Sequence, residues 1–137
     1  MAQALEQIPT TTEEDIVVLS VPAESAYLSV LRTATAGLAA RLHFTLDEIE
    51  DLRIAVDEAC AMLVTDAADN TDLTCRFSVA EDVLSVAVTV HVDGTVRLPG
   101  EQTFAWKVLS ALAGEVQAEH SDSRATIRLI KRRRASP

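Results

Sequence analysis

The clearest periodic pattern in the chain lies between residues 45 and 64. Thr45 and Glu48 have the spacing of a capping box, in which a threonine hydroxyl and a glutamate carboxylate each accept a hydrogen bond from a backbone amide at the helix start. Apolar residues then recur at three- and four-residue spacing. The stripe consists of Ile49, Leu52, Val56, Ala59 and Leu63. The pattern therefore predicts a helix that begins near Thr45 and buries one face.

A second helix is predicted before it, over residues 23–42. Its apolar stripe is expected to face the core and consists of Tyr27, Leu31, Ala34, Leu38 and Leu42. A second stripe is small and polar with one cation, and consists of Ser25, Ser29, Arg32 and Ala36. We expect this second stripe to face solvent or a partner. A third, short amphipathic helix is predicted from Phe104, Val108, Leu109 and Leu112, with Gly114 as its stop.

The strands are predicted by alternation of apolar and polar residues. Residues 73–79 and 84–92 alternate as an antiparallel hairpin, residues 16–21 form a first strand, and residues 116–119 and 125–130 form two closing strands. The order of elements predicts an α/β two-layer sandwich, with a mixed, mostly antiparallel sheet and three helices on one face. We expect one domain over residues 14–131, a flexible leader over 1–13 and a basic tail over 132–137.

Composition narrows the function classes. The chain has 137 residues, 48% of them apolar and 24% charged, and a net charge of −9, which disfavours direct nucleic-acid binding. It has no apolar run of membrane-spanning length and no signal-peptide layout, so we expect a cytoplasmic protein. Cys60 and Cys75 are expected to be buried free thiols. The three histidines lack ligand spacing, and no metal site is expected from them.

Several phrases together resemble a known family. The runs LDEIEDLRIAVDEAC, AARLHFT and FAWKVLSALAGEVQ resemble anti-sigma factors built on the histidine-kinase-like (GHKL) ATPase fold, with the closest likeness to the actinobacterial branch that inhibits an alternative stress sigma factor. The resemblance implies a homodimer that binds an alternative sigma factor and is released by an anti-sigma-factor antagonist in partner switching. Its catalytic version implies a serine/threonine protein kinase that phosphorylates the antagonist with ATP and Mg²⁺.

The resemblance also implies a catalytic pair on the central helix. The family places a general-base glutamate there, with an asparagine four residues later that holds Mg²⁺. Glu58 occupies the glutamate position, but Met62 occupies the asparagine position. A thioether is a poor ligand for a hard cation that prefers oxygen. Glu58 is therefore either the catalytic and nucleotide-binding base or a solvated helix glutamate.

Three further nucleotide motifs are degenerate. The family's glycine-rich turn, whose free amides hold phosphate at the start of the last helix, keeps only Gly100, and the helix entry reads Gln102-Thr103-Phe104-Ala105 without a glycine pair. The family's DxGxG box, which contacts adenine, is represented only by Asp93 and Gly94. The closing strand's Gly-Thr reads Arg124-Ala125-Thr126, so Thr126 is the residue in a related place. The nucleotide-binding candidates are Glu58, Asp93, Gly94 and Thr126. Because metal, adenine and phosphate contacts are all altered, the sequence puts ATP and Mg²⁺ binding in doubt.

The first long helix carries the candidate partner surface. Arg32 lies where the family places an arginine that contacts the sigma factor, and Ser29 and Ala36 beside it are small enough to let a partner approach. An exposed guanidinium can pair bidentately with a carboxylate. The alternative interpretation is an ordinary surface arginine. The leading hypothesis is thus an anti-sigma factor, against an active kinase and an unrelated small α/β ligand-binding module.

Overall fold

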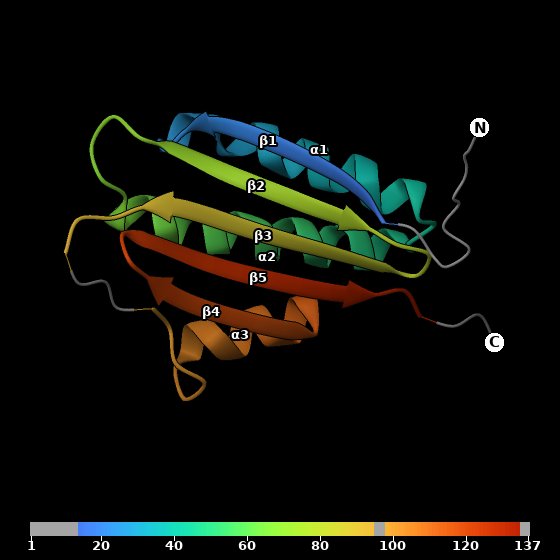
Figure 1. The fold of residues 1–137 in the computed structure, drawn as a ribbon. Coiled ribbons are helices and arrows are strands. Elements are labelled where there is room, and N and C mark those ends of the chain that lie inside the picture. The colour runs from blue at the N-terminus through green and yellow to red at the C-terminus, as the bar shows by residue number, and fades with distance from the viewer. Residues whose placement is uncertain (1–13, 95–97, 135–137) are drawn as a thin grey trace, which may run out of the picture.

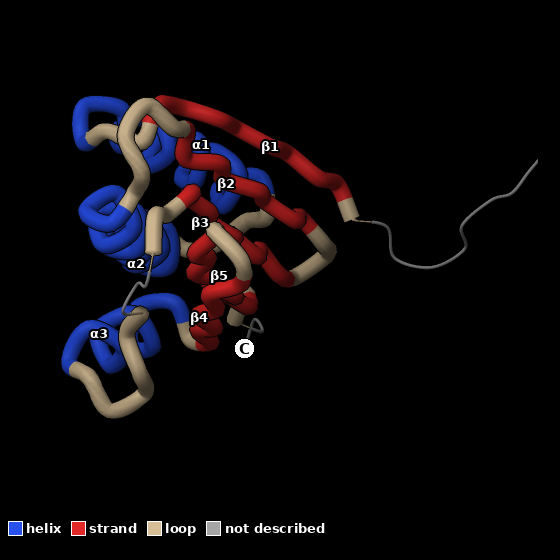
Figure 2. Tube along the Cα trace, turned by 60° about the vertical axis from the view of Figure 1, so that its left-hand side comes forward, coloured by secondary structure: helices blue, strands red, loops and turns tan. Residues whose placement is uncertain are grey.

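Three helices cover one face of a five-stranded sheet in the computed structural model, which describes residues 14–94 and 98–134 (Figure 1). Seen from another side, the helices form one layer and the strands the other (Figure 2). The elements are β1 (Asp15–Pro22), a 3-10 turn (Ser25–Tyr27), α1 (Leu28–Arg41), α2 (Leu46–Asp66), β2 (Asp72–Val79), β3 (Val83–His91), α3 (Phe104–Ala113), β4 (Glu115–Ser121) and β5 (Arg124–Arg132). The predicted two-layer sandwich is confirmed. The leader predicted for residues 1–13 lies outside the described residues.

The sheet has the strand order β1-β2-β3-β5-β4, and each neighbouring pair is antiparallel. The prediction of a mixed sheet is therefore wrong for the described strands. The physical reason is the position of β5, which the β4–β5 hairpin inserts between β3 and β4. Strand β4 runs in the same direction as β3, but the two are not neighbours and form no parallel pair.

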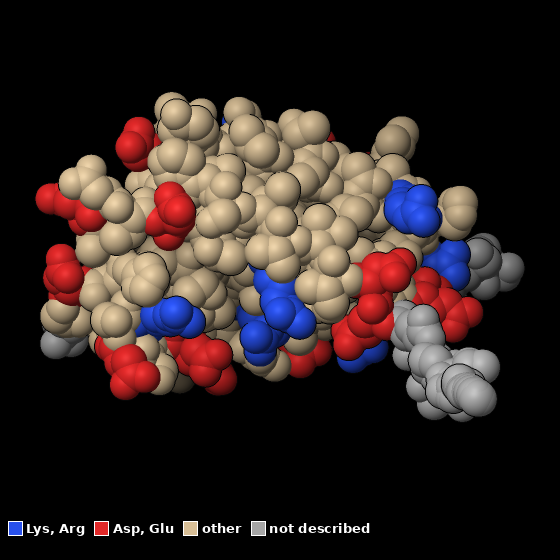
Figure 3. Space-filling view, turned by 45° about the horizontal axis from the view of Figure 1, so that its top comes forward, with Lys and Arg blue, Asp and Glu red and all other residues tan. Residues whose placement is uncertain are grey.

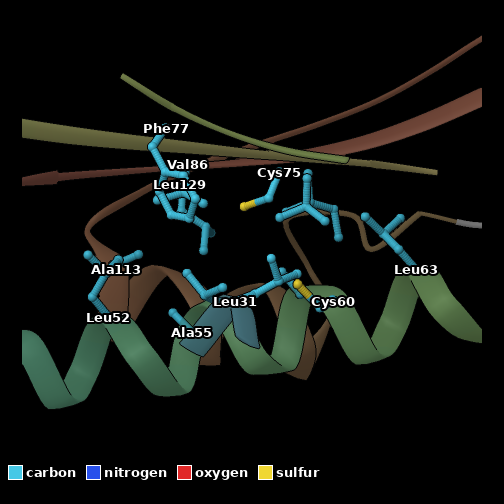
Figure 4. Packing of buried hydrophobic residues seen from close by; sticks show 14 of the residues in the cluster. Leu31, Leu52, Ala55, Cys60, Leu63, Cys75, Phe77, Val86, Ala113 and Leu129 are labelled. Carbon is cyan, nitrogen blue, oxygen red and sulfur yellow. The ribbon is translucent and has the colours of Figure 1, made fainter. Parts of the chain in front are cut away.

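The core lies between the sheet and the central helix α2. The helix-facing side chains of β2, β3 and β5 are buried at every second position, as alternation requires. Figure 4 shows side chains of the helices pointing toward side chains of the strands across this core. The apolar stripe predicted for α2 is confirmed: Leu52, Val56, Ala59 and Leu63 are buried, and Ile49 is half-buried against them.

The start of α1 differs from the prediction. Tyr27 was placed in the apolar stripe, but it is 41% exposed. Residues Ser25–Tyr27 form a 3-10 turn before α1 begins at Leu28. A 3-10 turn has three residues per turn, so it changes which residues face the sheet. The buried face of α1 consists of Leu28, Leu31, Thr35 and Ala39.

Phe104 also departs from the prediction, because it is 82% exposed. It is the first residue of α3, and a helical side chain points back over the preceding turn, which is missing at that position. Leu109 and Ala113 are buried instead, and Val108 and Leu112 are half-buried. Gly114 ends α3 with a φ of 98°, as predicted.

The C-terminal end of the domain lies later than the sequence indicated. A basic tail was predicted from residue 132, but β5 continues to Arg132, and the Arg133 guanidinium pairs with Asp82 at 2.6 Å. The Arg134 amide donates to Glu48 Oε2 at 3.1 Å. Residues 135–137 lie outside the described residues. Among the helices that the structure describes, none is long and apolar enough to cross a membrane.

Candidate functional site

The candidate partner surface lies on the outer side of α1, beside α2. Ser29 is exposed, and Arg32 and Ala36 are half-buried, so the predicted polar stripe does reach the surface. The Arg32 Nε atom lies 3.5 Å from Asp57 Oδ1 on α2. The two side chains are 40% and 38% exposed. The packing of α1 on α2 therefore brings the Arg32 guanidinium and the Asp57 carboxylate together at a solvent-exposed position.

This ion pair orients Arg32 without burying it. The contact joins Nε to one carboxylate oxygen, and the guanidinium has five N–H donors in all, so it keeps donor capacity for a partner. An exposed pair of this kind contributes at most about 1 kcal/mol to stability. An incoming carboxylate could replace Asp57 at small cost, because the guanidinium is already held at the surface in a defined position.

Sequence reasoning missed Asp57, although a signal for it was available. Arg32 directly follows the buried Leu31, and Asp57 directly follows the buried Val56. A residue that directly follows a core position on either helix lies next to the contact between α1 and α2. Opposite charges at such positions are candidates for an inter-helix pair.

Glu58 lies on the exposed side of α2, as either interpretation of it allows. Met62, one turn later, is half-buried and packs against the core cluster. The position that would hold Mg²⁺ is therefore occupied by an apolar side chain that contributes to packing. Within the described residues there is no group of three or more His, Cys, Asp or Glu side chains that could hold a metal ion.

Asp93 and Gly94 lie near the C-terminal end of α2. Val92 forms an isolated bridge with Ala67, which caps α2, and Gly94 has a φ of 74°. Ala67 is nine residues after Glu58, which is about 13 Å along a helix. Asp93 and Gly94 are thus placed at one end of α2, and Glu58 lies on its middle turns.

Thr126 does not join these residues. Ala125 faces the helices and is buried, so Thr126 faces the open side of the sheet, where its hydroxyl lies 2.8 Å from that of Thr89. Alternation along a strand places neighbouring side chains on opposite faces. The sheet therefore lies between Thr126 and Glu58, and the structure does not bring these two candidates together.

The N-terminal end of α3 is capped by hydrogen bonds within the chain. The Thr103 hydroxyl accepts a hydrogen bond from the Trp106 amide at 3.1 Å and donates to the Gly100 carbonyl at 2.7 Å. An amide that is capped internally is not free to bind phosphate. Met62, the position of Thr126 and the capped Trp106 amide are thus three places where the chain departs from the ATP and Mg²⁺ contacts that the resemblance implies.

The two cysteines are buried free thiols, as predicted, and offer no nucleophile to this surface. Burial raises the pKa of Cys60, and the charges of Cys75 and Asp57 raise it further. Burial raises the pKa of Cys75 to about 12. Since the thiolate is the reactive form, both groups are inert at neutral pH in the folded protein.

Comparison with curated proteins finds relatives named serine-protein kinase RsbW. The chain is 43% identical over 82 residues to the protein of Bacillus subtilis (strain 168), a match that covers 58% of this chain and 51% of that protein. It is 40% identical over 86 residues to the protein of Bacillus velezensis, with 61% and 54% covered. The chain spans about half the length of these relatives. No family model matches it.

A solved structure supports the fold. The crystal structure of the RsbU and RsbW domains of a Mycobacterium tuberculosis protein matches with a TM-score of 0.70 and 15% identity, over 87% of this chain and 32% of that chain. At this identity the likeness concerns the fold alone. The chain is therefore similar in sequence to RsbW kinases and similar in fold to a structure that contains an RsbW domain. The actinobacterial branch stays a prediction, because the two relatives described above come from Bacillus species.

Proposed function

We propose that this relative of the RsbW serine-protein kinases is an anti-sigma factor that binds and inhibits an alternative, stress-response sigma factor by direct contact. The α1 surface of Ser29, Arg32 and Ala36 forms the contact. An anti-sigma-factor antagonist competes for an overlapping surface and releases the sigma factor. The protein acts in the cytoplasm as a homodimer.

The observation that carries this proposal is the exposed Arg32–Asp57 pair. It presents a guanidinium whose position is fixed by α1 and whose partner carboxylate is replaceable. The small side chains of Ser29 and Ala36 on the same face leave room for an approaching helix or loop. A partner that supplies a carboxylate to Arg32 would form a charge-assisted hydrogen bond in place of a weak exposed pair.

The test is recovery of the partner from the host cells. We expect tagged protein to co-purify with one sigma factor, and added antagonist to displace it. Arg32→Ala should reduce the recovered sigma factor strongly, whereas Arg41→Ala, which removes an exposed arginine from the end of the same helix, should not. The proposal would be contradicted if no sigma factor co-purified with the tagged protein. It would also be contradicted if Arg32→Ala recovered as much sigma factor as the wild type.

The alternative is an active kinase, favoured by the sequence identity to proteins named as serine-protein kinases. In this alternative Glu58, which is exposed, takes the proton of an antagonist serine, and ATP bound by other contacts supplies the phosphoryl group.

Calorimetric titration with ATP, with and without Mg²⁺, separates the two. Because Met62 and the capped entry of α3 do not suit Mg²⁺ and phosphate, we expect no saturable binding up to about 1 mM, which corresponds to about −4 kcal/mol. Micromolar binding that requires Mg²⁺, followed by antagonist phosphorylation lost in Glu58→Ala, would make the kinase the better account.

A further inference from the structure

The face of the sheet that the helices leave open carries a hollow of about 400 Å³. Strands β2, β3, β5 and β4 line it, on the opposite side of the sheet from α1 and α2. Three arginines reach it, Arg76, Arg124 and Arg128, against two carboxylates, Asp72 and Glu119. In a chain with a net charge of −9, this is a local reversal of charge. Figure 3 shows one group of Lys and Arg atoms below the middle of the view, with further Lys and Arg atoms to either side and Asp and Glu atoms close by.

The register of the strands explains how the arginines meet. Arg76 on β2 pairs with Ala87 on β3, and Ala87 pairs with Arg128 on β5. The two arginines therefore stand in one row across the sheet, two strands apart, with Cα atoms separated by about 10 Å. Ala87 between them has only a methyl group. The row therefore leaves a gap above Ala87, with one arginine on each side of it.

The next row supplies hydroxyl groups. Thr74, Thr89 and Thr126 stand side by side across the same three strands. The Thr89 and Thr126 hydroxyls lie 2.8 Å apart, so one of them donates to the other. The second hydroxyl keeps its proton free to donate elsewhere. Hydroxyl donors therefore lie directly beside the gap above Ala87.

Three arginines of the described residues form ion pairs, but those of the hollow do not, and neither do Arg41, Arg132 and Arg134. Arg32, Arg53 and Arg133 each form an ion pair. Within residues 14–94 and 98–134, Arg76, Arg124 and Arg128 form none. Arg128 makes a long hydrogen bond to the neutral Gln117 Oε1, at 3.4 Å. The donors of this hollow thus have capacity for an external anion.

We propose that this hollow binds a small molecule through a phosphate-type oxyanion, held between Arg76 and Arg128 over Ala87. Guanidinium forks from two sides and threonine hydroxyls from the floor match the several oxygens of a tetrahedral anion. The hollow has the size of a small-molecule site. Asp72 and Glu119 also line the hollow, with Glu119 paired to Thr126 across β4 and β5, and these carboxylates and the overall negative charge disfavour long polyanions. The occupant would not compete directly for the α1 surface, which lies in the other layer.

The test uses inorganic phosphate and NMR amide shifts of the full chain at neutral pH, with sodium chloride at equal ionic strength as the control. We expect saturating shifts with a Kd of about 1 mM or below, centred on residues 74–76, 87–89 and 126–128. Arg76→Gln and Arg128→Gln should each weaken binding about tenfold, since each removes charge-assisted hydrogen bonds. Arg41→Gln, which removes the same charge from α1, should leave the Kd unchanged within about twofold.

A second pair of variants separates a shaped site from diffuse charge. Ala87→Leu fills the centre of the arginine row without changing any charge, and should weaken phosphate at least about tenfold. Ser85→Leu adds the same side chain two residues earlier on the same face of β3, and should not. Shifts that sodium chloride reproduces, or a Kd that Ala87→Leu and Arg76→Gln leave unchanged, would overturn the proposal. Unfolding midpoints of all variants establish that each is folded.

Discussion

At the residue scale, two polar contacts of the central helix α2 differ in how far apart their partners lie in the chain. The capping box of Thr45 and Glu48 needs only a spacing of three residues, and the structure has both of its hydrogen bonds. The Arg32–Asp57 pair joins two helices, so its existence depends on how they pack. Alternation with the apolar Ile127 and Leu129 places Thr126 on the face of the sheet away from the helices. If a motif is aligned one residue out of place along a strand, its side chains are assigned to the opposite face of the sheet.

Glu48 has a further role that the capping box does not imply. It is 3% exposed, and its carboxylate accepts from the Thr45 amide at 2.8 Å and the Arg134 amide at 3.1 Å. Burial acts to raise the pKa of Glu48, but these amides, the Thr45 hydroxyl and the charge of Lys131 lower it below its ordinary value. One carboxylate thus joins the start of α2 to the chain that follows β5.

We expect Glu48→Gln to reduce the free energy of unfolding by about 1–2 kcal/mol at pH 7. Because the pKa of Glu48 is lowered on folding, its contribution is present above the unfolded pKa of about 4.3 and is lost as the pH falls through the folded value. The difference between wild type and variant should therefore shrink below about pH 4. Urea unfolding at pH 7 and pH 3 measures it.

The control for this prediction is Glu58→Gln, which makes the same change at an exposed position of the same helix. It should alter stability by no more than about 0.5 kcal/mol at either pH. A Glu48→Gln variant as stable as wild type at pH 7 would mean that the two amide contacts contribute nothing net.

At the element scale, periodicity identified the three α-helices and five strands of the described residues, but it did not find the 3-10 turn and was wrong at helix starts. Alternation in residues 73–92 is strict, so the β2–β3 hairpin was predicted closely. Tyr27 and Phe104 were misplaced because they stand at the beginning of α1 and α3, where a 3-10 turn or a missing turn changes what a side chain faces. The spacing of apolar residues does not indicate where the first turn of a helix adopts 3-10 geometry.

Two glycines should respond in opposite directions to the same substitution. Gly37 lies within α1, is exposed, and has no atom within 4 Å of an added Cβ, so Gly37→Ala should stabilise the protein by about 0.5–1 kcal/mol. Gly114 has a φ of 98° at the end of α3, so Gly114→Ala should destabilise it by about 1 kcal/mol or more. Thermal unfolding of both variants checks the pair. A stabilising Gly114→Ala would contradict the conformation of this turn.

At the scale of the whole molecule, the two layers and the mostly antiparallel pairing were predictable, but the order of the strands in the sheet was not. The order of helices and strands determined a two-layer sandwich, because three amphipathic helices need one common sheet to cover. The mixed sheet was wrong because the sequence does not say that β5 lies between β3 and β4. The arginine row on the open face was not predicted for the same reason, since Arg76 and Arg128 are brought into one row only by that strand order.

The buried thiols report on the integrity of the whole fold. Cys60 lies on α2 and Cys75 on β2, and both are fully buried between the two layers. We expect neither thiol to react with Ellman's reagent in the native protein at pH 8, and both to react once urea unfolds it. Rapid reaction of either thiol under native conditions would show that the layers separate far more readily than this packing implies.

The central claim is that this fold serves here to bind a sigma factor without nucleotide chemistry. The most direct measurement is calorimetric titration of the purified chain with the sigma factor recovered from its host, with and without ATP and Mg²⁺. We predict the same affinity in both conditions and a loss of at least about 2 kcal/mol, or roughly thirtyfold, in Arg32→Ala. Binding that requires ATP and Mg²⁺, or that is unchanged in Arg32→Ala, would contradict the account.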